Sequence, residues 1–341
     1  MMVLRAMRSD EHDFDALCRI AELSGPGFTS LTTDRDLLHN KINRSEEAFT
    51  QALDAPLDEL YLFSLEDTAT NAVGGCCGLE SAVGMREPFY NYRVGTVVHA
   101  SRELGVYRKT PTLYLSNDYT GCSELCTLFL NPDFRGGGNG TLLSKARFLF
   151  MAEHPHRFNE RVLAEMRGWS DEQGESPFWD ALGRKFFDMD YARADHLTAV
   201  STKAFIAELM PRYPVYTTLL PEAAQRVIGR VHPNTEPALR MLKAEGFRYQ
   251  GYVDIFDGGA AVDVLFEDIK AIKRSRLAEL KVGAPAGDTR VLVSNRKLAE
   301  FRCTLTTVEL HDSGERLTAT AEVADALRLS DGDSLRYLPL A

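Results

Sequence analysis

The chain lacks any run of apolar residues near the roughly 20 that a membrane span needs, and it lacks any run of Lys or Arg that would form a basic face. Its 341 residues carry a formal net charge of −10. These features argue against a membrane protein and against a protein that binds nucleic acid, because phosphate contacts need a basic surface. An acidic protein can still bind an anion locally through backbone N–H groups, and its charge favours a cationic small substrate.

Paired or regularly spaced cysteines are also absent. The six cysteines include no C-x-x-C pair, so we expect reduced, mostly buried thiols and predict no metal site. The opening residues "MMVLRAMRSDEHD" lack the apolar core and small-residue cleavage pattern of a secretion signal. We therefore expect a cytoplasmic protein.

The pattern of apolar residues predicts a mixed α+β chain. Strands are expected at "MVLRAM", "YLFSLED", "AVGGCCGLESAVG", "YNYRVGTVVHAS", "TLYLSND", "SELCTLFLNP", "RVLAEMRG" and "RYQGYVDIF". Helices are expected after the cap candidates Ser9 and Asp10, after the glycine cluster at 136–140, over "SPFWDALGRKFF", and from Asn234 or Thr235 to Gly246.

The residue pattern of the sequence changes after Leu280. "KVGAPAGD" is typical of a linker, and it is followed by short strand patterns such as "RVLVSN" and "FRCTLTTVEL". We expect two domains, residues 1–280 and a small β-rich domain of residues 281–341 that resembles a barrel.

The stretch "NPDFRGGGNG", residues 131–140, has four glycines in five positions between a buried strand and a helix. It contains no G-x-x-x-x-G-K-[ST], and a dinucleotide fingerprint is incomplete because Leu143 replaces the third glycine. The pattern R-x-x-G-x-G/A, which binds the pyrophosphate of acyl-coenzyme A, fits Arg135, Gly138 and Gly140.

The expected phosphate contacts are backbone N–H groups at the start of the helix. They would come from the segment Gly136, Gly137, Gly138, Asn139, Gly140 and Thr141, with charge added by Arg135 or Lys145. A glycine-rich surface turn with no ligand is the alternative.

The sequence resembles the arginine N-succinyltransferase family over essentially its whole length. The resemblance rests on "PFYNYRVGTVVHAS", "SELCTLFLNPDFRGGGNG", "ESPFWDALGRKFFDMDY", "KAFIAELMPRYPVYT", "GRVHPNTEPALRMLKAEGF" and "YVDIFDGG". It implies a GNAT-type acyltransferase fold, with a mixed, mostly antiparallel central sheet flanked by helices. It also implies the reaction, in which succinyl-CoA, a co-substrate and not a bound cofactor, donates succinyl to the α-amine of L-arginine in arginine catabolism.

Two site residues follow from the same resemblance. Leu128 of "ELCTLFL" corresponds to a contact with succinyl-CoA, and His232 of "VHPNT" corresponds to the proton donor. The chemistry fits, because guanidinium stays protonated at neutral pH and the α-amine is the better nucleophile. A histidine that only caps the following helix is the alternative for His232, and His99 is a weaker candidate for the proton step.

Substrate contacts are less constrained by the sequence. A guanidinium favours carboxylates, and the candidates are Glu124, Glu165, Asp254 and Asp257. For the succinyl carboxylate the candidates are Arg93 and Asn117. A covalent route through Cys122 or Cys126 is possible in principle, but direct transfer from the coenzyme is simpler.

Three hypotheses about function remain at this point. The first is an arginine N-succinyltransferase, the second is an ornithine-preferring or broader arginine/ornithine enzyme, and the third is a non-catalytic coenzyme A sensor or structural subunit. The family resemblance also implies a homo-oligomer or a hetero-oligomer with a homologous subunit.

Overall fold

The computed structural model describes residues 1–25, 31–171, 174–191, 193–194, 197 and 204–340. Its strands are β1 (Met2–Ala6), β2 (Leu60–Asp67), β3 (Val73–Glu80), β4 (Asn91–Ser101), β5 (Val106–Ser116), β6 (Ser123–Leu130), β7 (Arg161–Glu165), β8 (Val215–Tyr216), β9 (Arg248–Asp254), β10 (Ala260–Leu265), β11 (Arg276–Val282), β12 (Thr289–Ser294), β13 (Arg302–His311), β14 (Arg316–Ala319) and β15 (Ser334–Pro339). Its helices are α1 (Glu11–Ser24), α2 (Arg35–Thr50), α3 (Asn139–Glu153), α4 (Pro177–Ala181), α5 (Gly183–Phe187), α7 (Ala204–Leu209), α8 (Glu222–Val227), α9 (Glu236–Glu245), α10 (Lys270–Arg274) and α11 (Ala321–Leu327).

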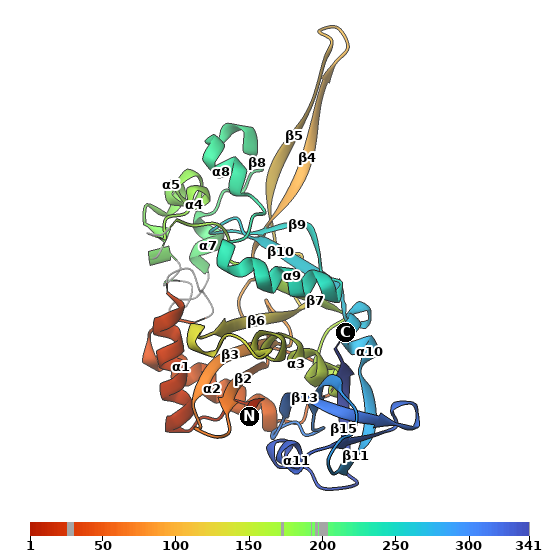
Figure 1. Cartoon of the computed structure of the whole chain (residues 1–341). Coiled ribbons are helices and arrows are strands. Elements are labelled where there is room, and N and C mark those ends of the chain that lie inside the picture. The colour runs from red at the N-terminus through yellow and green to blue at the C-terminus, as the bar shows by residue number, and fades with distance from the viewer. Residues whose placement is uncertain (26–30, 172–173, 192, 195–196, 198–203, 341) are drawn as a thin grey trace.

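The strands form one hydrogen-bonded sheet in the order β12-β15-β11-β14-β13-β1-β2-β3-β6-β7-β10-β9-β4-β5-β8. From β1 to β8 every neighbouring pair is antiparallel except β6–β7. The parallel β6–β7 pair has only two residue pairs in register, Ser123 with Val162 and Glu124 with Leu163. Beyond Glu124 the two strands therefore separate, and the sheet opens at its centre (Figure 1).

The C-terminal strands close into a five-stranded barrel. β12 pairs with both β15 and β13, and this completes the ring β12-β15-β11-β14-β13. Its interior is apolar, with Leu280, Val291, Leu317 and Leu335 fully buried. The expected C-terminal barrel and the expected mixed sheet flanked by helices are confirmed. β11 already belongs to the barrel, so the expected boundary between residues 280 and 281 falls within this strand.

Helix α3 connects the sheet to the barrel. The face expected to be apolar, Leu142, Leu143, Ala146, Leu149 and Phe150, is buried. The Phe150 ring contacts those of Phe63 in β2 and Phe301 just before β13, with centroids 5.1 and 5.2 Å apart. A buried aromatic cluster of this kind fixes the position of α3 against both parts of the molecule.

Several helix ends match the sequence pattern and one helix does not. Asp10 caps α1 by accepting the N–H of Asp13 at 3.0 Å, and Gly246 ends α9 with a φ of 113°. "SPFWDALGRKFF" was expected to be one helix, but it forms α4 and α5 with a break at Leu182. A Cβ added at Gly183 would lie only 2.2 Å from the Trp179 ring. The break therefore accompanies close packing of the indole on the glycine. No helix within the described residues is long and apolar enough to cross a membrane.

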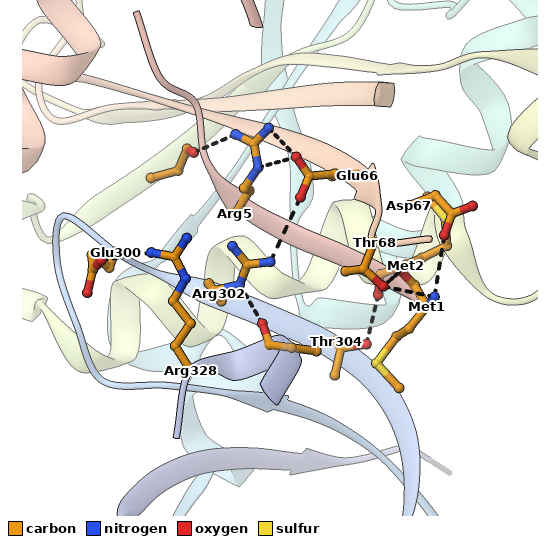
Figure 2. Close-up of polar contacts among 12 residues, drawn as sticks. Met1, Met2, Arg5, Glu66, Asp67, Thr68, Glu300, Arg302, Thr304 and Arg328 are labelled. Carbon is orange, nitrogen blue, oxygen red and sulfur yellow. Dashed lines mark hydrogen bonds and ion pairs between the residues drawn. The ribbon is translucent and has the colours of Figure 1, made fainter. Parts of the chain in front are cut away.

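A buried ionic network joins β1, β2 and the barrel (Figure 2). The Arg5 guanidinium donates to Asp13 Oδ1 at 2.7 Å and to Glu66 Oε2 at 2.8 Å. The other oxygen of Glu66 lies 3.9 Å from the Arg302 guanidinium of β13. Burial alone would raise the pKa of Asp13, but its contacts with Arg5 outweigh that effect and lower the pKa to about 2.

We predict that Arg5→Ala lowers the free energy of unfolding by about 3–5 kcal/mol at pH 7, because it removes the buried cation that donates hydrogen bonds to both Asp13 and Glu66. Asp13 has a folded pKa below its ordinary value of 3.8. Its stabilising effect is therefore present above about pH 4 and is lost as the pH falls toward 2. Urea unfolding at pH 7 and pH 3 should show a smaller gap between variant and wild type at pH 3.

The control is Arg226→Ala, which removes an exposed ion pair with Glu222 on α8. Its effect should stay within about 0.5 kcal/mol. An equal loss in both variants would mean that the buried network has no special role.

Candidate active site

The glycine loop connects β6 to α3 and has a left-handed backbone at three consecutive residues. Gly136, Gly137 and Gly138 have φ values of 108°, 60° and 96°. Residues with a Cβ rarely adopt such values, so the glycines are required by the path of the chain. Gly138 is the N-cap of α3, and the loop delivers the chain directly into this helix.

Most N–H groups of this loop lack a protein acceptor. Asn139 N–H donates to Gly136 O at 3.0 Å, but no acceptor among the described residues receives the N–H groups of Gly136, Gly137, Gly138, Gly140 or Thr141. These amides lie at the positive end of a 15-residue helix. Together they provide a site with the character that phosphate groups require.

The barrel contacts the same loop. Arg290 of β12 donates from Nη2 to Gly137 O at 3.2 Å, and Leu305 of β13 lies 2.3 Å from the position that a Cβ on Gly138 would take. Arg135 is exposed beside the loop. Lys145, the other suggested cation, forms an ion pair at 2.7 Å with the buried Glu245, so it is held by that pair and not by the loop.

Leu128 lies on the part of β6 that has separated from β7. The register with β3 shifts there. Cys76 pairs with Phe129 and Gly78 pairs with Cys126, so Thr127 and Leu128 together lie opposite the single residue Cys77. Thr127 has a φ of 54°, which is a strained value for a β-branched residue. The bulge turns the backbone of β6 at this point.

Carboxyl groups gather where β7, β9 and β4 meet. Glu165 ends β7, and its Oε1 accepts the side-chain N–H of Asn91 at 2.5 Å. Asn91 is in register with Asp254, the last residue of β9, and Asp257 follows in the next turn. Glu124 of β6 contributes its charge to the same group. The candidates taken separately from the sequence thus form one carboxylate cluster: Glu124, Glu165, Asp254 and Asp257.

Burial and mutual repulsion change the protonation of this cluster. Burial, and then the charges of Asp254 and Glu124, raise the pKa of Glu165 well above its ordinary value. Burial, and then the charge of Asp254, do the same for the pKa of Asp257. Like-charged carboxylates in one site retain protons until a cation compensates them. Glu165 and Asp257 therefore keep their protons to higher pH than isolated carboxyls do.

His232 lies beside the segment that carries this cluster. Its backbone N–H donates to Arg167 O at 2.8 Å, and the next bridge pairs Gly168 with Val231. Gly168 N–H in turn donates to Asp257 Oδ2 at 2.5 Å. Burial, and then the charge of Arg167, lowers the pKa of His232. The histidine and the carboxylates are thus fixed to the same few residues after β7.

His232 also caps the short turn Pro233–Thr235, because its Nδ1 accepts the N–H of Asn234 at 3.2 Å. Of the two expected caps, Thr235 is the N-cap residue of α9, although its side chain makes no capping hydrogen bond, and Asn234 lies inside the short turn. The neutral imidazole carries its proton on Nε2 in this geometry. The His232 side chain can therefore cap the turn through Nδ1 and still have Nε2–H available as a proton donor.

The remaining candidates lie apart from one another. Arg93 is exposed on β4, two residues from Asn91, with its guanidinium 6.0 Å from the centre of the Tyr252 ring. Asn117 is exposed in the turn after β5, where its carbonyl accepts the Thr120 N–H. His99 is farther along β4, with its ring 5.7 Å from that of Tyr216. No contact among the described residues joins Asn117 or His99 to the carboxylate cluster.

Neither suggested cysteine is suited to nucleophilic attack. Burial raises the pKa of Cys126 to about 12, and burial also raises the pKa of Cys122. The reactive form of cysteine is the thiolate, which is scarce at neutral pH when the pKa is this high. Neither thiol is therefore suited to a covalent route.

Comparison with known proteins identifies the family. Residues 2–271 match the family model "Arginine N-succinyltransferase beta subunit", and residues 274–339 match that of its C-terminal domain. The chain belongs to the arginine N-succinyltransferase family. It is therefore a transferase, as the sequence resemblance implied.

Individual relatives are similar to this chain over nearly its whole length. The chain is 51% identical to arginine N-succinyltransferase of Salmonella arizonae, covering 99% of this chain and 98% of the relative. It is 50% identical to that of Escherichia coli, covering 100% and 98%. A solved structure, arginine/ornithine succinyltransferase subunit AI from Pseudomonas aeruginosa, superposes with a TM-score of 0.91 at 37% identity, covering 100% of this chain and 99% of that one.

Two residues near the candidate site were missed by sequence reasoning. Arg290 is distant in sequence from the loop that it contacts, and no local pattern indicates the contact. Arg167 was within the quoted stretch "VLAEMRG" and follows Glu165 at a spacing of two, which in an extended segment places both on one face. That alternation was the signal available in the sequence.

We predict that Gly168→Ala lowers the free energy of unfolding by about 1–3 kcal/mol, the usual cost of overpacking. An added Cβ would lie 2.4 Å from Asp257 Oδ1 and 2.7 Å from Asp257 O, so the turn that holds the cluster must move. Gly283→Ala in the barrel is the control, since its nearest atom is 3.5 Å away. Urea unfolding followed by circular dichroism measures both, and equal stability of the two variants would contradict the packing argument.

Proposed function

We propose that this chain transfers the succinyl group of succinyl-CoA to the α-amine of L-arginine. The observation that carries the proposal is the carboxylate cluster, with His232 beside it, at the opening of the sheet that leads to the glycine loop. One end of this opening suits an anionic carrier and the other suits a cationic substrate. The two substrates can therefore meet along the free edge of β6.

The carrier end is formed by backbone. In this proposal the N–H groups of Gly136, Gly137, Gly138, Gly140 and Thr141 surround the diphosphate of coenzyme A, with Arg135 at the rim. The Asn139 N–H is already used by Gly136 O. Support comes from the unsatisfied amides and from the helix end that follows them. A GNAT-type fold for the ten strands from β1 to β8 in the sheet order is supported by three features of β6. It separates from β7, it carries the bulge at Thr127, and it leads into the glycine loop.

The substrate end binds by charge. The guanidinium of L-arginine stays protonated, and the buried carboxyls, Glu165 above all, receive it, with Glu124 and Asp254 nearby. Because the pKa of Glu165 is raised in the free protein, binding of a cation lowers it and releases a proton. For the succinyl carboxylate the proposed partners remain Arg93 and Asn117.

The acyl transfer itself needs few groups. The α-amine nitrogen forms a bond to the thioester carbon, the carbon–sulfur bond breaks, and the proton given up by the amine ends on the sulfur. The Leu128 N–H, turned by the bulge, is the proposed donor to the developing oxyanion, a contact typically worth about 3 kcal/mol. His232 is the proposed proton donor to the sulfur.

Ornithine is the second candidate substrate. The Pseudomonas aeruginosa relative is described as an arginine/ornithine succinyltransferase subunit, and a carboxylate cluster can receive an ammonium as well as a guanidinium. The word subunit also supports association with another copy or with a homologous chain. Comparison of kcat/KM for arginine and ornithine decides the preference.

The test is an assay of the purified chain with succinyl-CoA and L-arginine, with thiol release followed by a chromogenic disulfide and the product identified by mass spectrometry. We expect release that depends on L-arginine, with succinyl on the α-nitrogen. No release with either arginine or ornithine would reject the proposal.

The same assay tests the proton step. His232→Ala should lower turnover by about 100-fold or more, while the dissociation constant of succinyl-CoA, measured by calorimetry, stays unchanged. His99→Ala is the matched control and should keep turnover, since it lies on β4 away from the cluster. Near-normal turnover of His232→Ala would remove this residue from the mechanism.

A further inference from the structure

Arg167 lies on the same face of the chain as Glu165. The odd and even residues of β7 point to opposite sides: Val162, Ala164 and Met166 belong to the main apolar core, and Leu163 packs in a separate cluster with Ala261 and Tyr119. The extended path continues past Glu165, because Met166 N–H donates to Ala260 O and Gly168 bridges to Val231. Side chains two residues apart on such a path share a face, about 6.6 Å apart.

The hydrogen-bonding capacity of Arg167 is largely unused. Its Nη2 donates to Ser170 Oγ at 3.3 Å, and its Nε is buried without a hydrogen-bond partner among the described residues. A buried donor without a partner costs free energy, so a ligand that supplies an acceptor is favoured here. The charge of Arg167 also reaches His232, whose pKa it lowers in addition to the effect of burial.

We propose that Arg167 binds the α-carboxylate of the amino-acid substrate. The inference rests on the proposed function and deepens it. A free α-amino acid with a cationic side chain carries a cation at one end and a carboxylate at the other. Glu165 and Arg167 offer the complementary charges at a comparable separation, with His232 bound to the backbone of Arg167. The α-amine, next to the carboxylate, is thereby held at the end of the substrate nearer to His232.

This arrangement explains how the enzyme would select its nucleophile. A carboxylate anchor at Arg167 and a cation anchor at the cluster fix both ends of the substrate. Only the nitrogen beside the carboxylate then lies near the proton-transfer residue, and the side-chain cation is bound among carboxylates. Amines without a carboxylate lose one anchor and are discriminated against.

The experiment compares substrates that differ only in the carboxylate. L-Arginine, L-argininamide and agmatine, which lacks the carboxylate, are tested as substrates and as competitive inhibitors with wild type, Arg167→Gln and Arg167→Lys. We expect Arg167→Gln to lower kcat/KM for arginine by about 10- to 100-fold. The kcat/KM values and inhibition constants for agmatine and argininamide should stay within about threefold of wild type. Arg167→Lys should recover part of the loss for arginine. Inhibition constants provide the comparison even for a compound that is not turned over.

Arg161→Gln is the matched control, because Arg161 is on the same strand but pairs with Asp263 at 3.3 Å. It should affect arginine and agmatine alike. Equal losses for all three compounds in Arg167→Gln would overturn the proposal. So would a loss that disappears when acetyl-CoA replaces succinyl-CoA, since Arg167 would then hold the succinyl carboxylate. A wild type inactive with every donor instead rejects the proposed function itself.

A second inference comes from the β4–β5 hairpin, which extends far from the rest of the molecule (Figure 1). β9 pairs with β4 only over Asn91–Arg93, and β8 pairs with β5 only at Thr112 and Leu113. The outer part, residues 98–109, is called the arm. In the arm the two strands pair only with each other.

The arm exposes large apolar side chains: Val98 (49%), Leu104 (75%), Val106 (41%) and Tyr107 (65%). An isolated two-stranded hairpin is marginally stable in water, and clustered exposed apolar residues mark interaction sites. The arm also carries Arg102, Arg108 and Lys109 against Glu103, a net charge of 3 − 1 = +2, so the rest of the chain carries −10 − 2 = −12.

We infer that the arm docks on a second copy of this chain. The charge of +2 and the exposed apolar side chains of the arm are complementary to the net charge of −12 that the rest of an identical partner carries. Replacing residues 98–109 by Asn-Gly joins Val97 to Thr110, which are already paired in register, by a turn suited to a hairpin. Light scattering after size exclusion should give a dimer or larger for wild type and a monomer for the shortened chain.

Arg108→Glu with Lys109→Glu should weaken association at low salt without changing the hairpin. Two results would overturn the inference. One is a shortened chain that keeps the wild-type mass. The other is a wild type that is monomeric alone at micromolar concentration and associates only with a homologous subunit.

Discussion

The short pairing of β6 with β7 is the constraint on which the site depends. Two residue pairs hold the strands in parallel, and beyond Glu124 each strand continues without the other. The separated part of β6 exposes its backbone, carries the bulge at Thr127 and leads into the glycine loop. The separated end of β7 carries Glu165, and Arg167 follows two residues later. If the strands stayed paired to their ends, the ladder would use the backbone groups of β6 beyond Glu124 and leave none of them free.

An opening in the middle of a sheet weakens the sheet, so its two sides must be fixed by other contacts. On the β6 side, α3 and its aromatic contacts with β2 and the residues before β13 provide this support. Arg5, Asp13, Glu66 and Arg302 connect the same strands to the barrel through a buried ionic network. The barrel in turn contacts the glycine loop through Arg290. The small C-terminal barrel is thus part of the structure that holds the loop in place.

Much of this could be predicted from the sequence, because the patterns are local. The strands, the buried face of α3, the cap at Asp10 and the C-terminal barrel follow from periodicity and turn residues. The break at Leu182 did not, since it depends on Trp179 packing against Gly183. Of the site, the glycine loop was recognisable from spacing, and the carboxylates only as separate candidates. Their convergence depends on the pairing of β7, β10, β9 and β4, which are separated by long stretches of chain. Arg290 was not predictable for the same reason.

The distribution of charge explains why the anion end of the proposed site would consist mainly of backbone groups. Lysines or arginines placed at the loop would bind phosphate, but their charges would also pair with the nearby carboxylates, as Lys145 pairs with Glu245. Amide dipoles act at short range and have no net charge. They can hold a diphosphate without neutralising an acidic cluster that must attract a cation. In the proposed function, a chain of net charge −10 can therefore bind a polyanionic carrier and a cationic amino acid next to each other, because the carrier is held mainly by fixed N–H groups.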